Sequence, residues 1–172
     1  MLKSALTMFA LFCLTPAVAG EPVGTARNGA VELAYWLQGP QDGIPLVIIN
    51  GQGAATRPGD GFTAALAAAG VRPPGGGAPR FRVTTFDNRD SARSTMLGAA
   101  GAPPSMEDIM AGHPPAYDLS DMAADTVAVL DAAGVRRAHV VGHSLGGMVA
   151  QMLAASHPDR VLSLVSVSST SG

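Results

Sequence analysis

The stretch that most constrains the fold of this chain runs from residue 138 to residue 157. Inside it, the pattern Gly-x-Ser-x-Gly at residues 142–146 directly follows the short apolar run Val140-Val141. After the second glycine, apolar residues recur at helical spacing until a proline stops them: Val149, Met152 and Leu153. The stretch therefore predicts a strand, a sharp turn at Ser144 and a helix.

A serine in such a turn has a chemical use. A serine hydroxyl is a poor nucleophile unless a base removes its proton and fixed donors meet the oxyanion that forms. The turn lifts the hydroxyl of Ser144 above the sheet, and glycines at 142 and 146 let neighbouring backbone approach. The amide of Leu145, at the positive end of the helix dipole, points to where an oxyanion would form. We expect Ser144 to be a nucleophile and Leu145 an oxyanion donor; the alternative is a glycine-rich turn in some other α/β protein.

The composition indicates one domain and argues against two kinds of partner. The chain has 172 residues, a formal net charge of -2 and a pI near 6.0, so neither nucleic acid nor an anionic membrane is an expected partner. Only 14% of the residues are charged, which suits an α/β protein rich in Ala, Val, Leu and Gly. The single cysteine, Cys13, lies in the amino-terminal leader, so the mature chain would have no disulfide, catalytic thiolate or zinc–thiolate site.

The first nineteen residues have the pattern of a secretory signal peptide. Lys3 supplies a positive start, residues 5–14 an apolar core, and Ala17-Val18-Ala19 a small-residue cleavage site. The apolar core is shorter than the ~20 residues that a membrane-spanning helix needs. We predict a signal peptide over residues 1–19, no stable membrane anchor after its cleavage, and a secreted or periplasmic protein.

Two strands and a second candidate oxyanion donor are expected in the first half of the chain. Residues 20–30 are interpreted as a polar lead, after which alternation predicts a strand over residues 31–37 with one face more buried. The apolar run at residues 46–49 is typical of a strand buried on both faces of a parallel sheet. It ends in Asn-Gly-Gln-Gly at residues 50–53, where glycines let the backbone present amides. Gln52 is the candidate second donor; the alternative is an ordinary strand-end turn.

The remaining elements follow from periodicity and capping residues. The expected elements are a helix from Phe62 closed by Gly70, a strand at 81–86, a helix capped by Asp118 and ended by Gly134, and a strand at 161–167. The acidic stretch Asp87-Asn88-Arg89-Asp90 is interpreted as a salt-bridged, hydrogen-bonded loop in preference to a catalytic pair of carboxylates. Residues 96–116 are irregular, and loops at this sheet edge usually build the pocket. Candidate substrate-binding residues are Met106, Met110 and His143.

The order of these elements and motifs resembles the α/β-hydrolase superfamily. Phe-Asp-Asn-Arg-Asp at 86–90, Asp-Met-Ala-Ala-Asp at 121–125 and Ala-His-Val-Val-Gly-His-Ser at 138–144 are similar to the esterase-like group that includes aclacinomycin methylesterase. The resemblance implies a three-layer α/β fold with a mostly parallel sheet. It also implies that Ser144 is the nucleophile, that Leu145 and Gln52 donate the oxyanion amides, and that no metal or organic cofactor is needed.

The sequence departs from that family in three places. Asn50 stands where many members have histidine, and Ser91-Ala92 replaces a commoner glycine-containing pattern. The acid and histidine that follow the nucleophile in the family would lie beyond Gly172, and none of the four histidines is placed as a base. We therefore expect residues 20–172 to be a partial domain whose sheet is truncated after the strand at 161–167, leaving a bare edge.

The expected function of the complete protein is cleavage of a small-molecule carboxylic ester through an acyl-enzyme. Cofactor-free haloperoxidation or C–C bond hydrolysis on the same fold is left open. The alternative from another class is a catalytically silent fragment, or a binding or assembly module with the same half-fold. The oligomeric state is also left open.

Overall fold

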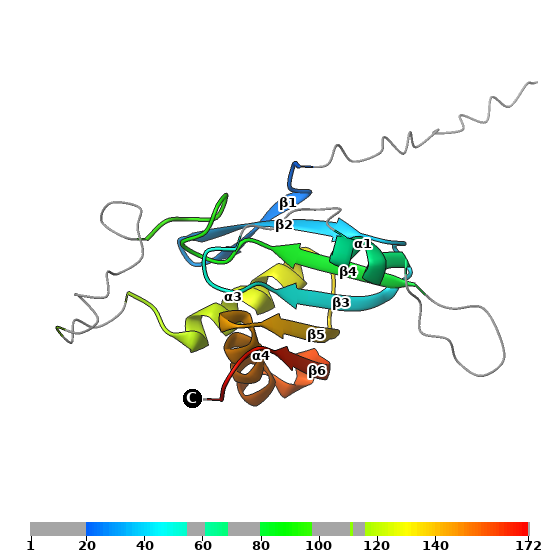
Figure 1. The fold of residues 1–172 in the computed structure, drawn as a ribbon. Coiled ribbons are helices and arrows are strands. Elements are labelled where there is room, and N and C mark those ends of the chain that lie inside the picture. The colour runs from blue at the N-terminus through cyan, green and yellow to red at the C-terminus, as the bar shows by residue number, and fades with distance from the viewer. Residues whose placement is uncertain (1–19, 55–60, 69–79, 98–110, 112–115, 172) are drawn as a thin grey trace, which may run out of the picture.

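The computed structural model describes residues 20–54, 61–68, 80–97, 111 and 116–171 (Figure 1). The predicted signal peptide lies outside these residues. Six strands form one sheet in the order β1-β2-β4-β3-β5-β6. The strands are β1 (Gly24–Asn28), β2 (Val31–Gln38), β3 (Ile44–Ile49), β4 (Phe81–Phe86), β5 (Ala138–His143) and β6 (Val161–Val167). The helices are α1 (Gly61–Ala68), α3 (Leu119–Ala132), α4 (Leu145–Ser156) and the short 3₁₀ helix η1 (Pro158–Arg160).

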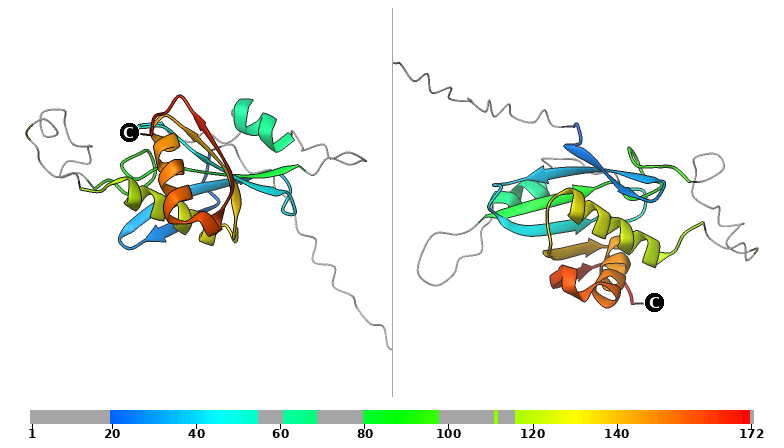
Figure 2. Two further views of the ribbon diagram at one scale, coloured as in Figure 1. Left: turned by 90° about the horizontal axis from the view of Figure 1, so that it is seen from below. Right: turned by 180° about the vertical axis from the view of Figure 1, so that it is seen from behind.

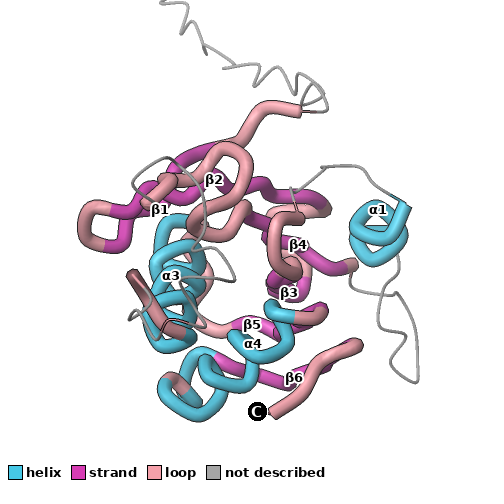
Figure 3. The backbone as a smooth tube through the Cα atoms, turned by 60° about the vertical axis from the view of Figure 1, so that its left-hand side comes forward, coloured by secondary structure: helices cyan, strands magenta, loops and turns pink. Residues whose placement is uncertain are grey.

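The sheet is mostly parallel, as predicted. β4, β3, β5 and β6 are parallel neighbours, whereas β1, β2 and β4 pair antiparallel. The parallel strands are connected through helices, which lie on both faces of the sheet (Figures 2 and 3). Because parallel strands run the same way, their carboxyl ends all meet at one edge of the sheet.

Three layers result from this connectivity. On one face, α3 and α4 pack on a core that includes Leu33, Val47, Phe86, Val140 and Leu153. On the other face α1 lies over β4, where Leu66 and Ala67 pack against Leu46, Ile48 and Val83. Strands covered on both faces are the reason that residues 46–49 carry no polar side chain. The predicted three-layer α/β fold is confirmed.

The interpretation of residues 20–30 as a polar lead is wrong, because residues 24–28 form β1. This strand joins β2 through a two-residue turn, in which Gly29 has φ +60°, and Asn28 pairs with Val31. Ala26 is 1% exposed and belongs to the core under α3. The strand is polar because most of its side chains face solvent, and β2 supplies the pairing.

β2 is also more buried than expected. Residues 33–36 are all buried, so both faces of the strand are covered and not one. Along its edge, the segment that follows β4 continues the pairing: the amide of Asp87 donates to the carbonyl of Ala34 at 3.0 Å, and the amide of Thr95 to that of Glu32 at 2.9 Å. Residues 31–35 of β2 therefore have hydrogen-bonded neighbours on both sides.

The limits of α3 confirm the two capping residues that the sequence indicates for it, whereas Gly70, the expected end of the helix from Phe62, lies outside the described residues. The side chain of Asp118 accepts from the amides of Ser120 and Asp121, and Asp121 returns a bond to the amide of Asp118. These backbone hydrogen bonds lower the pKa of Asp118 from its ordinary value. Gly134, with φ +68°, follows the end of α3.

Candidate active site

Ser144 sits in a strained turn between β5 and α4. Its backbone has φ +54° and ψ −121°, a conformation that is costly for any residue with a Cβ. Its amide donates to the carbonyl of Val167 at 2.9 Å, which ties the turn to the end of β6. Although Ser144 occupies the N-cap position of α4, its side chain makes no capping hydrogen bond, in contrast to Asp118 on α3. The hydroxyl of Ser144 is therefore not used to cap the helix.

Close backbone contacts explain the two glycines of the pattern. A Cβ on Gly142 would collide with the carbonyl oxygen of Gly146, and would lie 2.6 Å from the Cα of Gly147. A Cβ on Gly146 would collide with the carbonyl oxygen of Ile49 and lie 2.6 Å from that of Asn50. Both positions exclude a side chain, so the turn requires glycine for space and not for backbone freedom.

Two amides near Ser144 are without a backbone partner among the described residues. The amide of Leu145 is the first in α4, where the first four helix amides have no intrahelical acceptor. Gln52 is the second residue of a turn in which the amide of Ala54 donates to the carbonyl of Gly51 at 3.3 Å, with Gly53 at φ +66°. No backbone hydrogen bond from the amide of Gln52 is found among the described residues.

One pocket brings together the three residues predicted to act in catalysis. Ser144, Leu145 and Gln52 line a pocket of about 410 Å³. The rest of its wall comes from Met148 on α4 and from the segment after β6: Ser168, Ser169 and Thr170. The sequence reasoning missed this hydroxyl-rich segment. The signal was its position directly after a strand that neighbours β5, at the edge where Ser144 lies.

Of the three candidate substrate-binding residues, only His143 lies among the described residues. His143 is exposed, and its Nδ1 would lie 3.4 Å from a Cβ on Gly51, but it does not line the pocket. Met106 and Met110 lie outside the described residues, as does His113.

The described histidines other than His143 lie away from Ser144. His139 is on β5, with its Nδ1 2.7 Å from the hydroxyl of Ser163 and its ring edge-on to Phe81. His157 follows the far end of α4. In the part of the chain that the structure describes, no histidine lines the Ser144 pocket.

The acidic stretch after β4 is a bonded loop, as interpreted from the sequence. Arg89 donates to Asp125 through Nε at 2.6 Å and Nη2 at 2.8 Å, and its guanidinium lies 5.0 Å from the ring centroid of Tyr117. Burial disfavours the charged guanidinium, but the hydrogen bonds and charge of Asp125 outweigh it and raise the pKa of Arg89. Burial and a hydrogen bond with Asp90 raise the pKa of Tyr117 to about 12.

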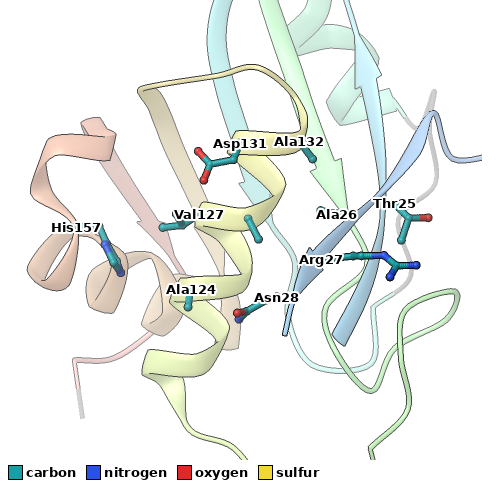
Figure 4. Close-up of a pocket in the computed structure, with 10 residues that line it drawn as sticks. Thr25, Ala26, Arg27, Asn28, Ala124, Val127, Asp131, Ala132 and His157 are labelled. Atoms are coloured by element: carbon teal, nitrogen blue, oxygen red, sulfur yellow. The ribbon is translucent and has the colours of Figure 1, made fainter. Parts of the chain in front are cut away.

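A larger pocket lies elsewhere and lacks a nucleophile. It has a volume of about 600 Å³ and runs between β1 and α3 to His157 (Figure 4). It shares no lining residue with the Ser144 pocket. Two of its polar residues are hydrogen-bonded elsewhere: Asn28 donates to Asp125, and Asp131 accepts from Arg160.

The described residues hold neither a metal-binding cluster nor a membrane-spanning helix. These residues contain no cluster of His, Cys, Asp and Glu that could hold a metal ion. None of the helices found there is both long and apolar enough to cross a bilayer.

The family match and two similar curated proteins all point to hydrolases. Residues 44–171 match the family described as alpha/beta hydrolase fold. RutD of Variovorax paradoxus (strain S110), provisionally named a carbamate hydrolase, is 34% identical over 81% of this chain and 43% of its own length. Rhodomycin D methylesterase DauP of Streptomyces sp. (strain C5) is 37% identical over 77% of this chain and 38% of its own length.

Solved structures agree with the sequence relatives. A hydrolase from Pseudomonas aeruginosa superposes with a TM-score of 0.63 and 30% identity, over 86% of this chain and 46% of that one. Est816, described as an N-acyl homoserine lactone degrading enzyme, gives a TM-score of 0.60 and 28% identity, over 85% of this chain and 45% of its own. The chain spans less than half the length of each of these relatives. With its sheet order, its strand–turn–helix at Ser144 and a family match over most of its length, the chain belongs to the alpha/beta hydrolase fold family.

Proposed function

We propose that the complete gene product hydrolyses a carboxylic ester, with Ser144 as nucleophile. The observation that carries the proposal is the pocket that Ser144, Leu145 and Gln52 line together, where Ser144 has φ +54° and its side chain makes no capping hydrogen bond. A strained backbone persists at a functional site because the surrounding structure holds it, and here Val167 and the glycine contacts do so. Relatives named as a methylesterase and a lactone-degrading enzyme support the substrate class.

The proposed reaction has two steps. The Oγ of Ser144 bonds to the ester carbonyl carbon, a base takes its proton, and the carbonyl oxygen becomes an oxyanion that the amides of Leu145 and Gln52 stabilise. The bond to the alcohol oxygen then breaks, and the alcohol leaves with the proton. Water next attacks the acyl-enzyme, releasing the acid and restoring the hydroxyl of Ser144. We assign the base and its orienting acid to residues outside those that the structure describes.

The test uses Ser144→Ala in the complete gene product. Hydrolysis of p-nitrophenyl acetate is expected to fall by about 10⁴-fold or more, since the covalent route is removed. Ser156→Ala is the matched control, because this serine is the last residue of α4 and its hydroxyl donates to the carbonyl of Met152 in the same helix. Its rate should stay within about twofold of the wild type. If Ser144→Ala keeps the hydrolysis rate of the wild type, the proposal is wrong.

A second measurement distinguishes an active hydrolase from a catalytically silent protein with the same fold. A fluorophosphonate labels only a serine that is activated by a base and an oxyanion site. We expect labelling of Ser144 in the complete gene product and none in Ser144→Ala. A complete gene product that neither labels nor hydrolyses would instead support a binding or assembly role for this fold.

A further inference from the structure

Asn88 contacts the backbone of the segment that carries Gln52. Its side-chain Nδ2 donates a 2.9 Å hydrogen bond to the carbonyl oxygen of Asn50, and the residue is only 4% exposed. Asn88 follows β4, and Asn50 follows the parallel neighbour β3, where Ile48 pairs with Thr85. The hydrogen bond therefore crosses between the carboxyl ends of two adjacent strands, at the edge of the sheet that holds Ser144.

The Asn50 carbonyl is enclosed on another side by α4. A Cβ on Gly146 would lie 2.6 Å from that carbonyl oxygen, so the first turn of the helix packs directly against it. One residue further along, a Cβ on Gly51 would lie 3.2 Å from the Cβ of Ser144. The peptide group between Asn50 and Gly51 is thus held between α4 and Asn88, in contact with the turn that carries the nucleophile.

The position of Asn88 is fixed by its neighbours. The carbonyl of Asp87 accepts from the hydroxyl of Ser94 at 2.6 Å, and Arg89 is bonded twice to Asp125. Anchors on both sides leave the Asn88 side chain little freedom to turn away from Asn50. Such support is what a site needs if its donors are to stay within a fraction of an ångström of their working positions.

We propose that Asn88 is a positioning residue for the oxyanion hole, which acts through the Asn50 carbonyl and touches no substrate. The inference rests on the proposed function of Ser144. If the Asn50 carbonyl is released, the peptide group between Asn50 and Gly51 can turn and the φ of Gly51 changes with it, which moves the following peptide group that carries the amide of Gln52. An oxyanion donor acts only within hydrogen-bond distance of the oxygen in the transition state, so this rotation would weaken catalysis more than substrate binding.

The experiment measures p-nitrophenyl acetate hydrolysis by Asn88→Ala in the complete gene product. We expect kcat to fall by about tenfold or more with KM within about twofold, since loss of a transition-state contact lowers kcat. Asn88→Asp, which keeps the shape and lacks the donor when ionised, should behave in the same way. Thr126→Val is the matched control: Thr126 is as buried as Asn88 and donates to the carbonyl of Met122 within α3, so this variant should lose stability and keep kcat per folded molecule.

A pair of inhibitors supplies a readout that loss of stability does not change. A trifluoromethyl ketone forms a tetrahedral adduct with an oxyanion, whereas the methyl ketone of the same carbon chain binds without one. Asn88→Ala should weaken the first by the same factor as kcat/KM and leave the second within about twofold. Equal effects on both ketones, or a kcat equal to that of Thr126→Val, would overturn the inference. Ser144→Ala in the same series keeps the two proposals apart: activity in that variant contradicts the nucleophile, not Asn88.

Discussion

Removal of the charge on Asp125 should destabilise the protein more than any change at an exposed ion pair. The carboxylate is 1% exposed and the Arg89 side chain 5%, and they share two hydrogen bonds, of 2.6 and 2.8 Å. Asn28 donates to the same carboxylate at 2.8 Å. Asp125→Asn keeps the shape but leaves the guanidinium buried without a counter-charge. Breaking a buried pair in this way costs about 3–5 kcal/mol.

Because the substituted amide still accepts one hydrogen bond, we expect the lower end of that range, about 3 kcal/mol. For a chain of this length that corresponds to a fall in melting temperature of roughly 6–12 °C. Asp131→Asn is the matched control, because Asp131 is 65% exposed and pairs with Arg160 at 2.5 Å. A pair with such an exposed member contributes about 0–1 kcal/mol.

The assay is urea unfolding followed by the fluorescence of Trp36, the single tryptophan, which is 3% exposed in the fold. A change of midpoint at constant slope reports stability alone. The double variant Arg89→Met, Asp125→Leu should recover most of the loss, because apolar side chains of similar volume remove the unpaired charge. If Asp125→Asn shifts the midpoint no further than Asp131→Asn does, the reasoning about the buried pair is refuted.

Three smaller predictions follow from strain, an unmade hydrogen bond and a shifted pKa. Ala92 is exposed and has φ +44°, so Ala92→Gly should raise the free energy of unfolding by about 0.5–1 kcal/mol. The substitution relieves about 1–2 kcal/mol of left-handed backbone strain, which exceeds the cost of the greater freedom of the unfolded chain. A lower stability in urea unfolding would contradict this. Thr85→Val should leave the free energy of unfolding unchanged or raise it by up to about 1 kcal/mol, because the Thr85 hydroxyl is buried without a partner in the described structure. Thr126→Val should lower the free energy of unfolding by about 1 kcal/mol, because it removes the hydrogen bond to the Met122 carbonyl. The fold raises the pKa of Tyr117 from 10.0 to about 12, so the stability that this shift contributes is present below pH 10 and is lost as the pH rises through 12. The difference in phenolate absorbance at 295 nm between the wild type and Tyr117→Phe should therefore titrate near pH 12.

Elements with a strong local signal could be predicted, and those defined by pairing could not. The strand and helix around Ser144 were evident because the apolar spacing changes at the glycine pattern, and the structure shows that a Cβ at Gly142 or Gly146 would collide with backbone. β1 was missed because Ala26 is its only fully buried residue, so its existence depends on hydrogen bonds to β2. The Asn28-Gly29 pair was visible, but it indicates a hairpin only when strands flank it on both sides.

In the candidate site, too, some residues could be predicted from local sequence patterns and others could not. Ser144, Leu145 and Gln52 could be proposed because each lies within a short glycine-containing pattern at the end of an apolar strand. Ser168 to Thr170 and Asn88 could not, since their positions depend on the register of β6 against β5 and of β4 against β3. No local pattern in the sequence encodes that register.

The sheet order explains why one site draws on four separate segments. β3, β4, β5 and β6 are parallel neighbours, so the residues that follow them reach one edge together, whereas β2 runs the other way between β1 and β4. At that edge each segment is held by the next: Asn88 bonds to the Asn50 carbonyl, Gly146 packs on it, and the amide of Ser144 bonds to Val167. A substitution that shifts β4 against β3 should therefore disturb the Gln52 amide even though it leaves Ser144 and its turn unchanged.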